Sequence, residues 1–341
     1  MSQTLGQVGE FRLIAKIHEM IAKEGIQPPK NLLGIGDDCA AFQPRPGYDL
    51  LVTCDCMVED RHYLPRFMSS HDVGRRAMTL NISDIGAMGG RPRYALVSLG
   101  LRADMSLDDV IAVYRGFLAE LNPFEALIIG GNVTKSDGAN FLDITLIGEV
   151  ESGRMVRRST AKHGDAILTT GYPGQAVAGL TLLLQSERTG GRAENPLVSA
   201  YLRPSHRAAE GYAVAQTGLA HAMIDTSDGL MGDLGHICDE SRVGAVIYEK
   251  NLPVAPALIQ FSEHSGQTPL DYILKESDDY ELLLTCAPDN VGRIRHIIEK
   301  TSKIPVTEIG KITEDKGKIR IITPAGESRL STVSGWDHFS K

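Results

Sequence analysis

The sequence predicts a two-domain α/β protein. Its 341 residues exceed the usual length of one domain, and a hydrophobic content of 42% supplies enough apolar side chains for two cores. Runs typical of strands alternate with runs typical of helices on both sides of a polar, glycine-containing stretch at residues 151–165. We therefore expect domains at residues 1–152 and 153–341, the first built on a mixed sheet.

The first domain is expected to begin with an amphipathic helix over residues 9–24, where Phe11, Ile14, Ile17, His18 and Ile21 recur at helical spacing. Strands are predicted at residues 50–53, 94–99 and 141–147, and helices at 73–88 and 107–121. The glycine pair at residues 130–131 follows an apolar run. It indicates either a strand-to-loop turn or a place where the backbone approaches a ligand.

The second domain repeats this mixture. Strands are predicted at residues 166–170, 222–224 and 281–286, and helices at 174–185 and 291–301. A polar insert covers residues 187–195, and a hairpin-like pair of strands over residues 304–323 closes the domain.

Composition argues against several functional classes. The net charge is −8 without a basic block, so a nucleic-acid-binding surface has little support. No apolar run reaches the roughly 18 residues of a membrane span, and the N-terminal segment has no apolar signal core. The five cysteines are odd in number and lack C-x-x-C spacing, which favours reduced thiols in the cytoplasm. A soft-metal site at Cys54 and Cys56 has no His or Cys partner nearby in sequence.

Acidic clusters that end apolar runs carry most of the functional information. They are Gly36-Asp37-Asp38, Cys54-Asp55, Asn81-Ile82-Ser83-Asp84, Asp225-Thr226-Ser227-Asp228-Gly229 and Ser277-Asp278-Asp279-Tyr280-Glu281. Carboxylate oxygens suit Mg²⁺, and several Mg²⁺ ions in one site are typical of polyphosphate chemistry. In the fourth cluster, a strand-to-helix turn would aim Asp225 and Asp228 into one cleft. Ser and Asp before a helix also cap it, and one residue can cap while another binds metal.

Two phosphate-binding motifs are absent. Gly34-Ile35-Gly36-Asp37-Asp38 lacks the third glycine of a dinucleotide fingerprint, and its acids would repel a pyrophosphate. Gly130-Gly131-Asn132-Val133-Thr134-Lys135-Ser136 has Thr134 where a P-loop needs glycine before its lysine. Phosphate contact through Mg²⁺ is therefore favoured.

Taken in order, these motifs resemble those of thiamine-monophosphate kinases, which belong to the PurM-like, aminoimidazole-ribonucleotide synthetase superfamily. The resemblance also includes Val58-Glu59-x-x-His62-Tyr63, Asp279-Tyr280-Glu281-Leu282 and Trp336-Asp337-His338-Phe339, and it runs from about residue 10 to residue 339. It implies a two-domain PurM-like subunit that forms a homodimer through its N-terminal sheet and binds ATP with Mg²⁺. The implied reaction passes the γ-phosphoryl group directly to thiamine monophosphate, without a covalent enzyme intermediate.

The resemblance also assigns site residues. The implied metal ligands are Asp38, Thr53, Cys54, Asp55, Asp84, Asn132, Asp225 and Asp228. The implied ATP contacts are Tyr114, Gly131, Asn132, Arg158 and Ser227, and the implied substrate contacts are His62, Asp278 and Trp336. Independently, a guanidinium such as that of Arg158 can grip phosphate oxygens, and an aromatic face such as that of Trp336 suits stacking on a heterocycle.

Four departures from the family pattern lie at these positions. Asn132 replaces an aspartate, Asp278 replaces a glutamate, Cys54 replaces a hydroxyl residue and Asp60 replaces a glycine. An active kinase is the leading hypothesis. The changes at Asp278 and Asp60 leave open an ATP-using enzyme with another phosphorylated acceptor, and Asn132 leaves open a non-catalytic protein that binds nucleotide or thiamine phosphate.

Overall fold

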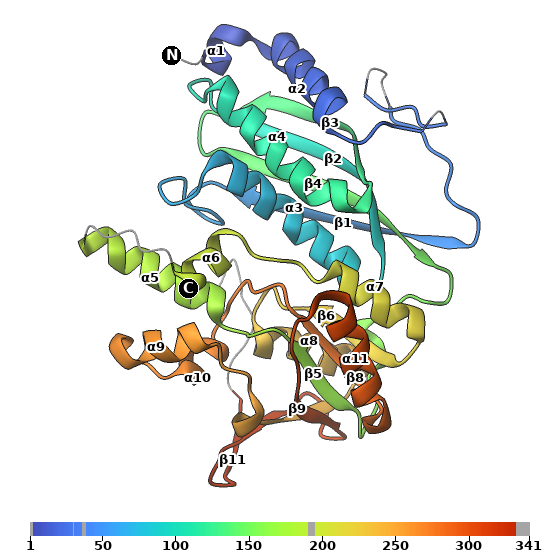
Figure 1. Ribbon diagram of the computed structural model, residues 1–341, viewed down its shortest axis with the longest axis vertical. Helices are drawn as coiled ribbons and strands as arrows, with labels where there is room; N and C mark the ends of the chain where they lie inside the picture. The colour runs from blue at the N-terminus through green and yellow to red at the C-terminus, as the bar shows by residue number, and fades with distance from the viewer. Residues whose placement is uncertain (1–2, 30, 36–38, 190–194, 332–341) are drawn as a thin grey trace. The chain divides into compact units, whose positions relative to one another are not determined.

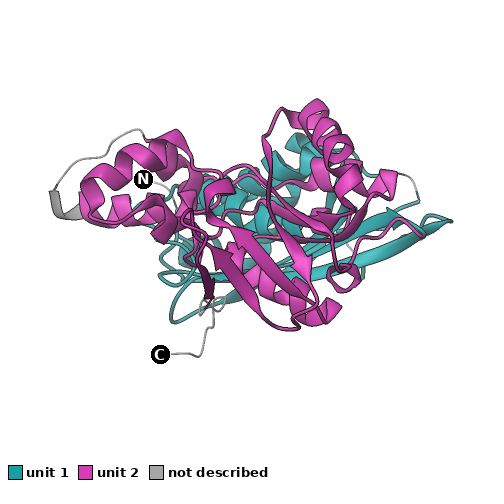
Figure 2. Cartoon of the chain, turned by 90° about the horizontal axis from the view of Figure 1, so that it is seen from below, with its two compact units in different colours: residues 1–85, 90–152 teal, residues 86–89, 153–341 magenta. Residues whose placement is uncertain are grey.

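The computed structural model describes residues 3–29, 31–35, 39–189 and 195–331. The chain divides into two compact units, coloured separately in Figure 2. Unit 1 comprises Met1–Ile85 and Gly90–Ser152, and unit 2 comprises Gly86–Gly89 and Gly153–Lys341. Among the described residues, none of the helices is both long and apolar enough to cross a membrane.

Unit 1 is a four-stranded mixed sheet with the order β1-β4-β2-β3. Its strands are β1 (Tyr48–Val58), β2 (Arg91–Leu101), β3 (Leu127–Lys135) and β4 (Phe141–Glu151). The helices of this part of the chain are α1 (Leu5–Val8), α2 (Glu10–Glu24), α3 (Ser70–Ala87) and α4 (Leu107–Leu121), with a 3-10 turn η1 (Asn122–Phe124). In Figure 1, α3 and α4 lie across one face of the sheet.

Two glycines let α3 and α4 approach closely. A Cβ on Gly116 would lie 2.2 Å from the His71 carbonyl oxygen, and one on Gly74 would lie 2.0 Å from that of Val113. The core beneath them contains Ala95, Val97 and Leu99 of β2, which alternate along the strand and are fully buried. The sheet face that carries these residues is therefore sealed by the two helices.

Unit 2 is a seven-stranded sheet with helices on both faces. Its strand order is β11-β10-β7-β9-β5-β8-β6, and its strands are β5 (Ala166–Thr170), β6 (Ala220–Asp225), β7 (Gly244–Tyr248), β8 (Leu282–Cys286), β9 (Val306–Thr313), β10 (Ile319–Ile322) and β11 (Ser328–Leu330). Its helices are α5 (Gln175–Thr189), α6 (Pro196–Leu202), α7 (Ala208–Thr217), α8 (Leu230–Ser241), α9 (Pro256–Ser265), α10 (Pro269–Ile273) and α11 (Val291–Ser302). Short 3-10 turns are η2 (Arg158–Thr160), η3 (Glu249–Asn251) and η4 (Pro288–Asn290).

Two separate apolar clusters form the core of unit 2. One joins the sheet to α8 and α9 through side chains such as Leu234, Ile237 and Leu258. The other joins it to α7 and α11 through Val214 and Ile294. The predicted α/β class is confirmed, with helices and sheet combined in each unit.

One of the two alternatives for the glycine pair is excluded, and one local prediction is wrong. The pair at residues 130–131 lies inside β3 and not in a strand-to-loop turn. A Cβ on Gly131 would fall 2.0 Å from the Val97 carbonyl oxygen of neighbouring β2, so this strand position requires glycine. Residues 304–323 do not form a hairpin. Strand β7 lies between β9 and β10, pairing antiparallel with one and parallel with the other.

Candidate functional site

A carboxylate pair lies between β1 and α3 in unit 1. Strand alternation puts Thr53 and Asp55 on the same face of β1. The Thr53 hydroxyl donates a hydrogen bond to Asp84 of α3. Burial, the negative charge of Asp84 and a hydrogen bond with Asp84 raise the pKa of Asp55 to about 7, and the charge of Asp143 adds to this. Two close carboxylates with a neighbouring hydroxyl form an oxygen-rich group suited to a hard cation.

The Cys54 side chain does not join this group. It projects from the other face of β1, where its thiol donates to Asp143 Oδ1 at 3.2 Å and accepts from Thr145 Oγ1 at 3.5 Å. Because adjacent residues of a strand alternate in direction, only the Cys54 backbone can share an ion with Thr53 and Asp55.

The predicted nucleotide contacts of unit 1 line one cavity. Tyr114, Gly131 and Asn132 surround a space of about 640 Å³, together with apolar side chains of α2 such as Ile14 and Ile17. The glycine in β3 exposes backbone to this space, while α2 supplies an apolar wall. A cavity of this size and character fits a planar, largely apolar ring with polar substituents. Asp38 and Trp336 lie outside the described residues.

The predicted substrate contact His62 lies in the loop after β1. Its Nδ1 accepts a hydrogen bond from the Val58 N–H at 3.0 Å. This bond fixes the ring orientation and places the proton of the neutral imidazole on Nε2.

In unit 2, the turn after β6 carries Asp225, Ser227 and Asp228. Asp225 is buried at the end of the strand, and Ser227 is exposed in the turn. Gly229 has φ +93°, and a Cβ there would lie 2.7 Å from the Lys275 carbonyl oxygen. Glycine is therefore required where the turn passes the segment before Asp278.

Backbone hydrogen bonds fasten this turn to residues 280–281. Thr226 N donates to the Glu281 carbonyl at 2.8 Å, and Tyr280 N donates to the Thr226 carbonyl at 2.9 Å. The Thr226 hydroxyl also accepts from Glu281 N at 3.1 Å. Asp278 is consequently held on the segment bonded to the turn that bears Ser227 and Asp228.

Both neighbours of Asp278 cap the start of α5. Asp279 accepts hydrogen bonds from Gly174 N at 2.6 Å and Ala176 N at 2.9 Å. Ser277 Oγ accepts from Val177 N at 3.1 Å. These contacts use the free N–H groups of a helix terminus to fix the backbone of Asp278.

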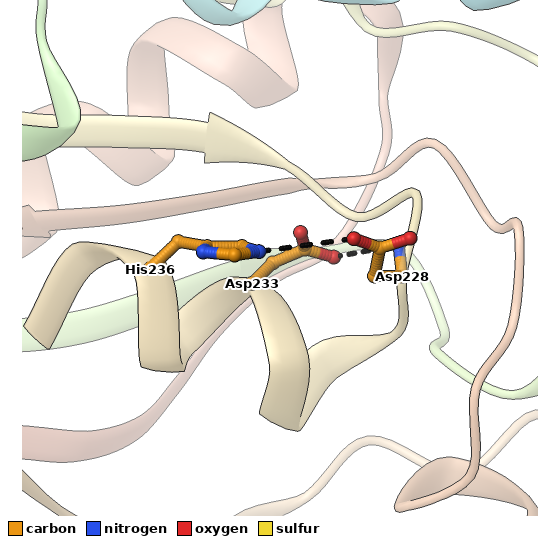
Figure 3. Close-up of side chains that lie close together, drawn as sticks. All are labelled: Asp228, Asp233 and His236. Atoms are coloured by element: carbon orange, nitrogen blue, oxygen red, sulfur yellow. Dashed lines mark hydrogen bonds and ion pairs between the residues drawn. The ribbon is translucent and has the colours of Figure 1, made fainter. Parts of the chain in front are cut away.

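Asp233 and His236 of α8 join Asp228, as Figure 3 shows. The Asp228 N–H donates to Asp233 Oδ2 at 3.0 Å, and His236 Nε2 lies 3.7 Å from Asp228 Oδ2. One potential ligand atom from each side chain lies within 4.8 Å of the others. Sequence reasoning missed Asp233 and His236, although their spacing of three residues on a helix was a usable signal.

Arg158 acts on the same group. Burial raises the pKa of Asp233 to about 8, and the charges of Asp225 and Asp228 add to the increase. The hydrogen bond from Asp228 and the positive charge of Arg158 partly offset it. Ser241 Oγ, at the end of α8, donates to the Arg158 carbonyl at 2.8 Å and accepts from Ala161 N at 3.0 Å, so α8 also holds η2.

These pKa values predict how the metal-free protein responds to pH. Because the pKa values of Asp55 and Asp233 lie above the ordinary value of 3.8, the folded protein retains protons that the unfolded chain releases between about pH 4 and pH 8. Stability should therefore fall as pH rises through this range. In the presence of chelator, we expect a thermal midpoint several degrees lower at about pH 8 than at about pH 5.

Adding Mg²⁺ at the higher pH should raise the midpoint again, because the ion favours the ionised carboxylates. Thermal melts of the wild type and of Asp55→Asn provide the check, since the variant should show a weaker pH dependence. Equal midpoints at both pH values in the wild type would contradict the charge arrangement described above.

Comparisons with known proteins cover nearly the whole chain. The family model for the AIR synthase related protein N-terminal domain matches residues 36–150, and that for the C-terminal domain matches residues 162–322. A thiamine-monophosphate kinase of Haemophilus influenzae is 32% identical over 339 residues, covering 98% of this chain and 99% of the relative.

Solved structures agree. A thiamine-monophosphate kinase from Stenotrophomonas maltophilia superposes with a TM-score of 0.80 at 32% identity, covering 96% of this chain and 99% of its own. A structure of AaThiL complexed with AMPPCP and TMP has a TM-score of 0.75 at 31% identity, covering 99% of this chain and 100% of its own.

Proposed function

Because the chain belongs to the thiamine-monophosphate kinase family, we propose that it transfers the γ-phosphoryl group of ATP to the phosphate of thiamine monophosphate, giving thiamine diphosphate and ADP. The match to named kinases over nearly the full length of both chains is the observation that carries the proposal. The attacking group is a phosphate oxygen, which is already anionic. The protein therefore needs to align the two substrates and offset their charge rather than supply a strong base.

The carboxylates are proposed to hold several Mg²⁺ ions. In unit 1 the ligands would be Thr53, Asp55 and Asp84, with Asp38, Asn132 and the Cys54 backbone as further members. In unit 2 they would be Asp225 and Asp228. Burial and the repulsion from Asp84 raise the pKa of Asp55, which supports this assignment because a bound cation would relieve the repulsion. Bound Mg²⁺ would supply charge neutralisation for the polyphosphate.

ATP is the proposed co-substrate. Tyr114 and Gly131 line the cavity of about 640 Å³, which is large enough for the base of a nucleotide. Arg158 and Ser227 are the proposed contacts from unit 2, with the guanidinium suited to phosphate oxygens. Thiamine monophosphate would be contacted by His62, Asp278 and Trp336.

A homodimer built on the sheet of unit 1 is also proposed. The face of β1 turned away from α3 and α4 carries Leu50 and Val52, which are 41% and 66% exposed. Strand β1 is an edge strand of eleven residues. Exposed apolar side chains on a long edge strand favour association with a second copy.

A location in the cytoplasm is also proposed. All five cysteines are free, which supports it.

A panel of acceptors tests the proposal. Purified protein with ATP and Mg²⁺ should release ADP with thiamine monophosphate and not with other phosphate monoesters of similar size. ADP release with another ester alone would favour the related enzyme of different specificity. Binding of ATP and thiamine monophosphate without turnover would favour a non-catalytic binding protein.

Asn132→Asp separates a weakened site from an inactive one. Restoring a negative charge on exposed Asn132 should raise kcat/KM about tenfold at limiting Mg²⁺, because an extra carboxylate ligand tightens ion binding. The difference should shrink when Mg²⁺ saturates. Steady-state kinetics over a Mg²⁺ series provide the check, with Asn290→Asp as a control that adds the same charge beside α11. Equal effects of both substitutions would argue against Asn132 as a ligand.

A further inference from the structure

We propose that a second cavity in unit 1 binds a small aminated heteroaromatic ring that carries no phosphate. This cavity, here called the α4 cavity, has a volume of about 310 Å³ and is lined by α3, α4, β2, β4 and the loop after β1. Of the described residues proposed for ATP, metal or thiamine monophosphate, none lines it. The part of unit 1 that the structure describes therefore has a cavity whose ligand is still to be assigned.

The floor of the α4 cavity suits a flat apolar ring. It consists of buried aliphatic and thioether side chains, namely Met68, Val73, Leu99, Leu101, Val110 and Leu142. Small-molecule pockets usually span roughly 300–1,000 Å³, so this one lies at the lower end. It has room for a single ring system with short substituents and is small for a nucleotide.

Tyr63 provides a polar group at the surface of the α4 cavity. The side chain is only 5% exposed and lines the cavity. Among the residues that the structure describes, no hydrogen bond to the Tyr63 hydroxyl is found. Burial raises the pKa of this hydroxyl, and the charge of Glu59 adds to the increase, so it remains a protonated donor. The hydroxyl is not one of the fully buried unpartnered atoms of the described chain, so it is accessible from the cavity that Tyr63 lines. A ring nitrogen of a ligand there can accept its hydrogen bond.

The polar wall of the α4 cavity includes Glu59, Arg102, Asn140 and Asp109. Hydrogen bonds hold these side chains in place. Arg102 Nη1 donates to Glu59 Oε1 at 2.8 Å, and Arg102 N donates to Asn140 Oδ1 at 2.7 Å. On the opposite side, Asp109 accepts from Ser70 Oγ at 2.7 Å and from Ser106 Oγ at 2.6 Å, which joins the first turns of α3 and α4. Such cross-linked walls lower the entropic cost of binding.

The charges of the wall select against anions. Three carboxylates, those of Glu59, Asp104 and Asp109, face one guanidinium. That guanidinium, on Arg102, is already engaged by Glu59 at 2.8 Å and by Asp104 at 3.2 Å. A phosphate would find no available cation here. An amino group is favoured instead, because a carboxylate can accept more hydrogen bonds than these contacts use.

Calorimetric titration with two probes tests the proposal. The probes are 4-amino-2-methylpyrimidine and thiamine, each without phosphate. The inference rests on the proposed kinase activity only in the choice of thiamine, and the titration needs no turnover. We expect the wild type to bind at least one probe. Tyr63→Phe removes only the unpartnered hydroxyl and should weaken binding about fivefold.

A second variant fills the cavity. Met105 lines the α4 cavity and is half-buried, so Met105→Trp can enlarge the side chain from the rim and should weaken binding at least about tenfold. Tyr48→Phe makes the same chemical change outside the cavity and should bind like the wild type. Folding of each variant is checked by its thermal midpoint.

Kinetics then identify the source of the ligand. If the ring belongs to the phosphorylated acceptor, Tyr63→Phe should raise the KM for thiamine monophosphate about fivefold and leave the KM for ATP unchanged. If it belongs to a separate effector, that KM should stay constant and thiamine monophosphate should not displace the probe. Absence of binding to the wild type, or equal affinities in all four proteins, would overturn the proposal.

Discussion

Asp84→Asn is expected to reduce kcat/KM for thiamine monophosphate by about 1,000-fold without unfolding the protein. The substitution removes one of two close carboxylates, and with it much of the field that would attract Mg²⁺ to the polyphosphate. The amide oxygen of asparagine can still accept the hydrogen bond from Thr53. Steady-state kinetics, with ADP release followed by a coupled enzyme assay, measure the loss.

The same substitution should not lower the thermal stability of the metal-free protein. Because Asp84 repels Asp55 in the metal-free protein, Asp84→Asn should leave the thermal midpoint unchanged or raise it. Asp49→Asn makes the same chemical change on strand β1, where the exposed carboxylate accepts a hydrogen bond from Ser152 Oγ at 2.9 Å. It should retain activity. Activity of Asp84→Asn close to that of the wild type would contradict the proposed role of the carboxylate pair.

Arg158→Ala is expected to lower kcat/KM for ATP about 100-fold. The guanidinium lies near enough to act on the charge of Asp233, while Ser241 holds its backbone at 2.8 Å. A guanidinium that contacts phosphate oxygens stabilises charge in the transition state, and loss of one such donor has an effect of about this size. Initial-rate measurements over a range of ATP concentrations provide the check.

Arg157→Ala is the control for this prediction. Both side chains are exposed and adjacent in sequence, so a general effect of surface charge would act on both variants alike. We expect Arg157→Ala to resemble the wild type. Similar losses in the two variants would show that Arg158 contributes only to the charge of the surface.

Local periodicity predicted most of the secondary structure. The helix expected at residues 107–121 is α4, and the strand expected at 166–170 is β5, with both ends correct. Both elements carry strong local signals, one through amphipathic spacing and the other through a continuous apolar run. The pairing of β7 with β9 and β10 depends on contacts between residues 63 to 74 positions apart, which no local pattern encodes.

The acidic cluster after β6 ends a strand as the sequence indicated, and the turn there presents Asp225 and Asp228. Asp55 instead lies inside β1, which continues to Val58, and strand alternation brings it to one face with Thr53. The same alternation turns the Cys54 thiol away. Asp233 and His236 were missed because they lie inside a helix, where acidic and imidazole side chains are ordinary surface residues until the turn is folded beside them.

The most direct test follows the transferred group itself. Purified protein is incubated with ATP labelled at the γ-phosphate, Mg²⁺ and thiamine monophosphate, and the products are separated. We expect label in the terminal phosphate of thiamine diphosphate, in equal amount to the ADP formed, and no transfer when chelator is present. Label found only in inorganic phosphate, or retained entirely in ATP, would contradict it.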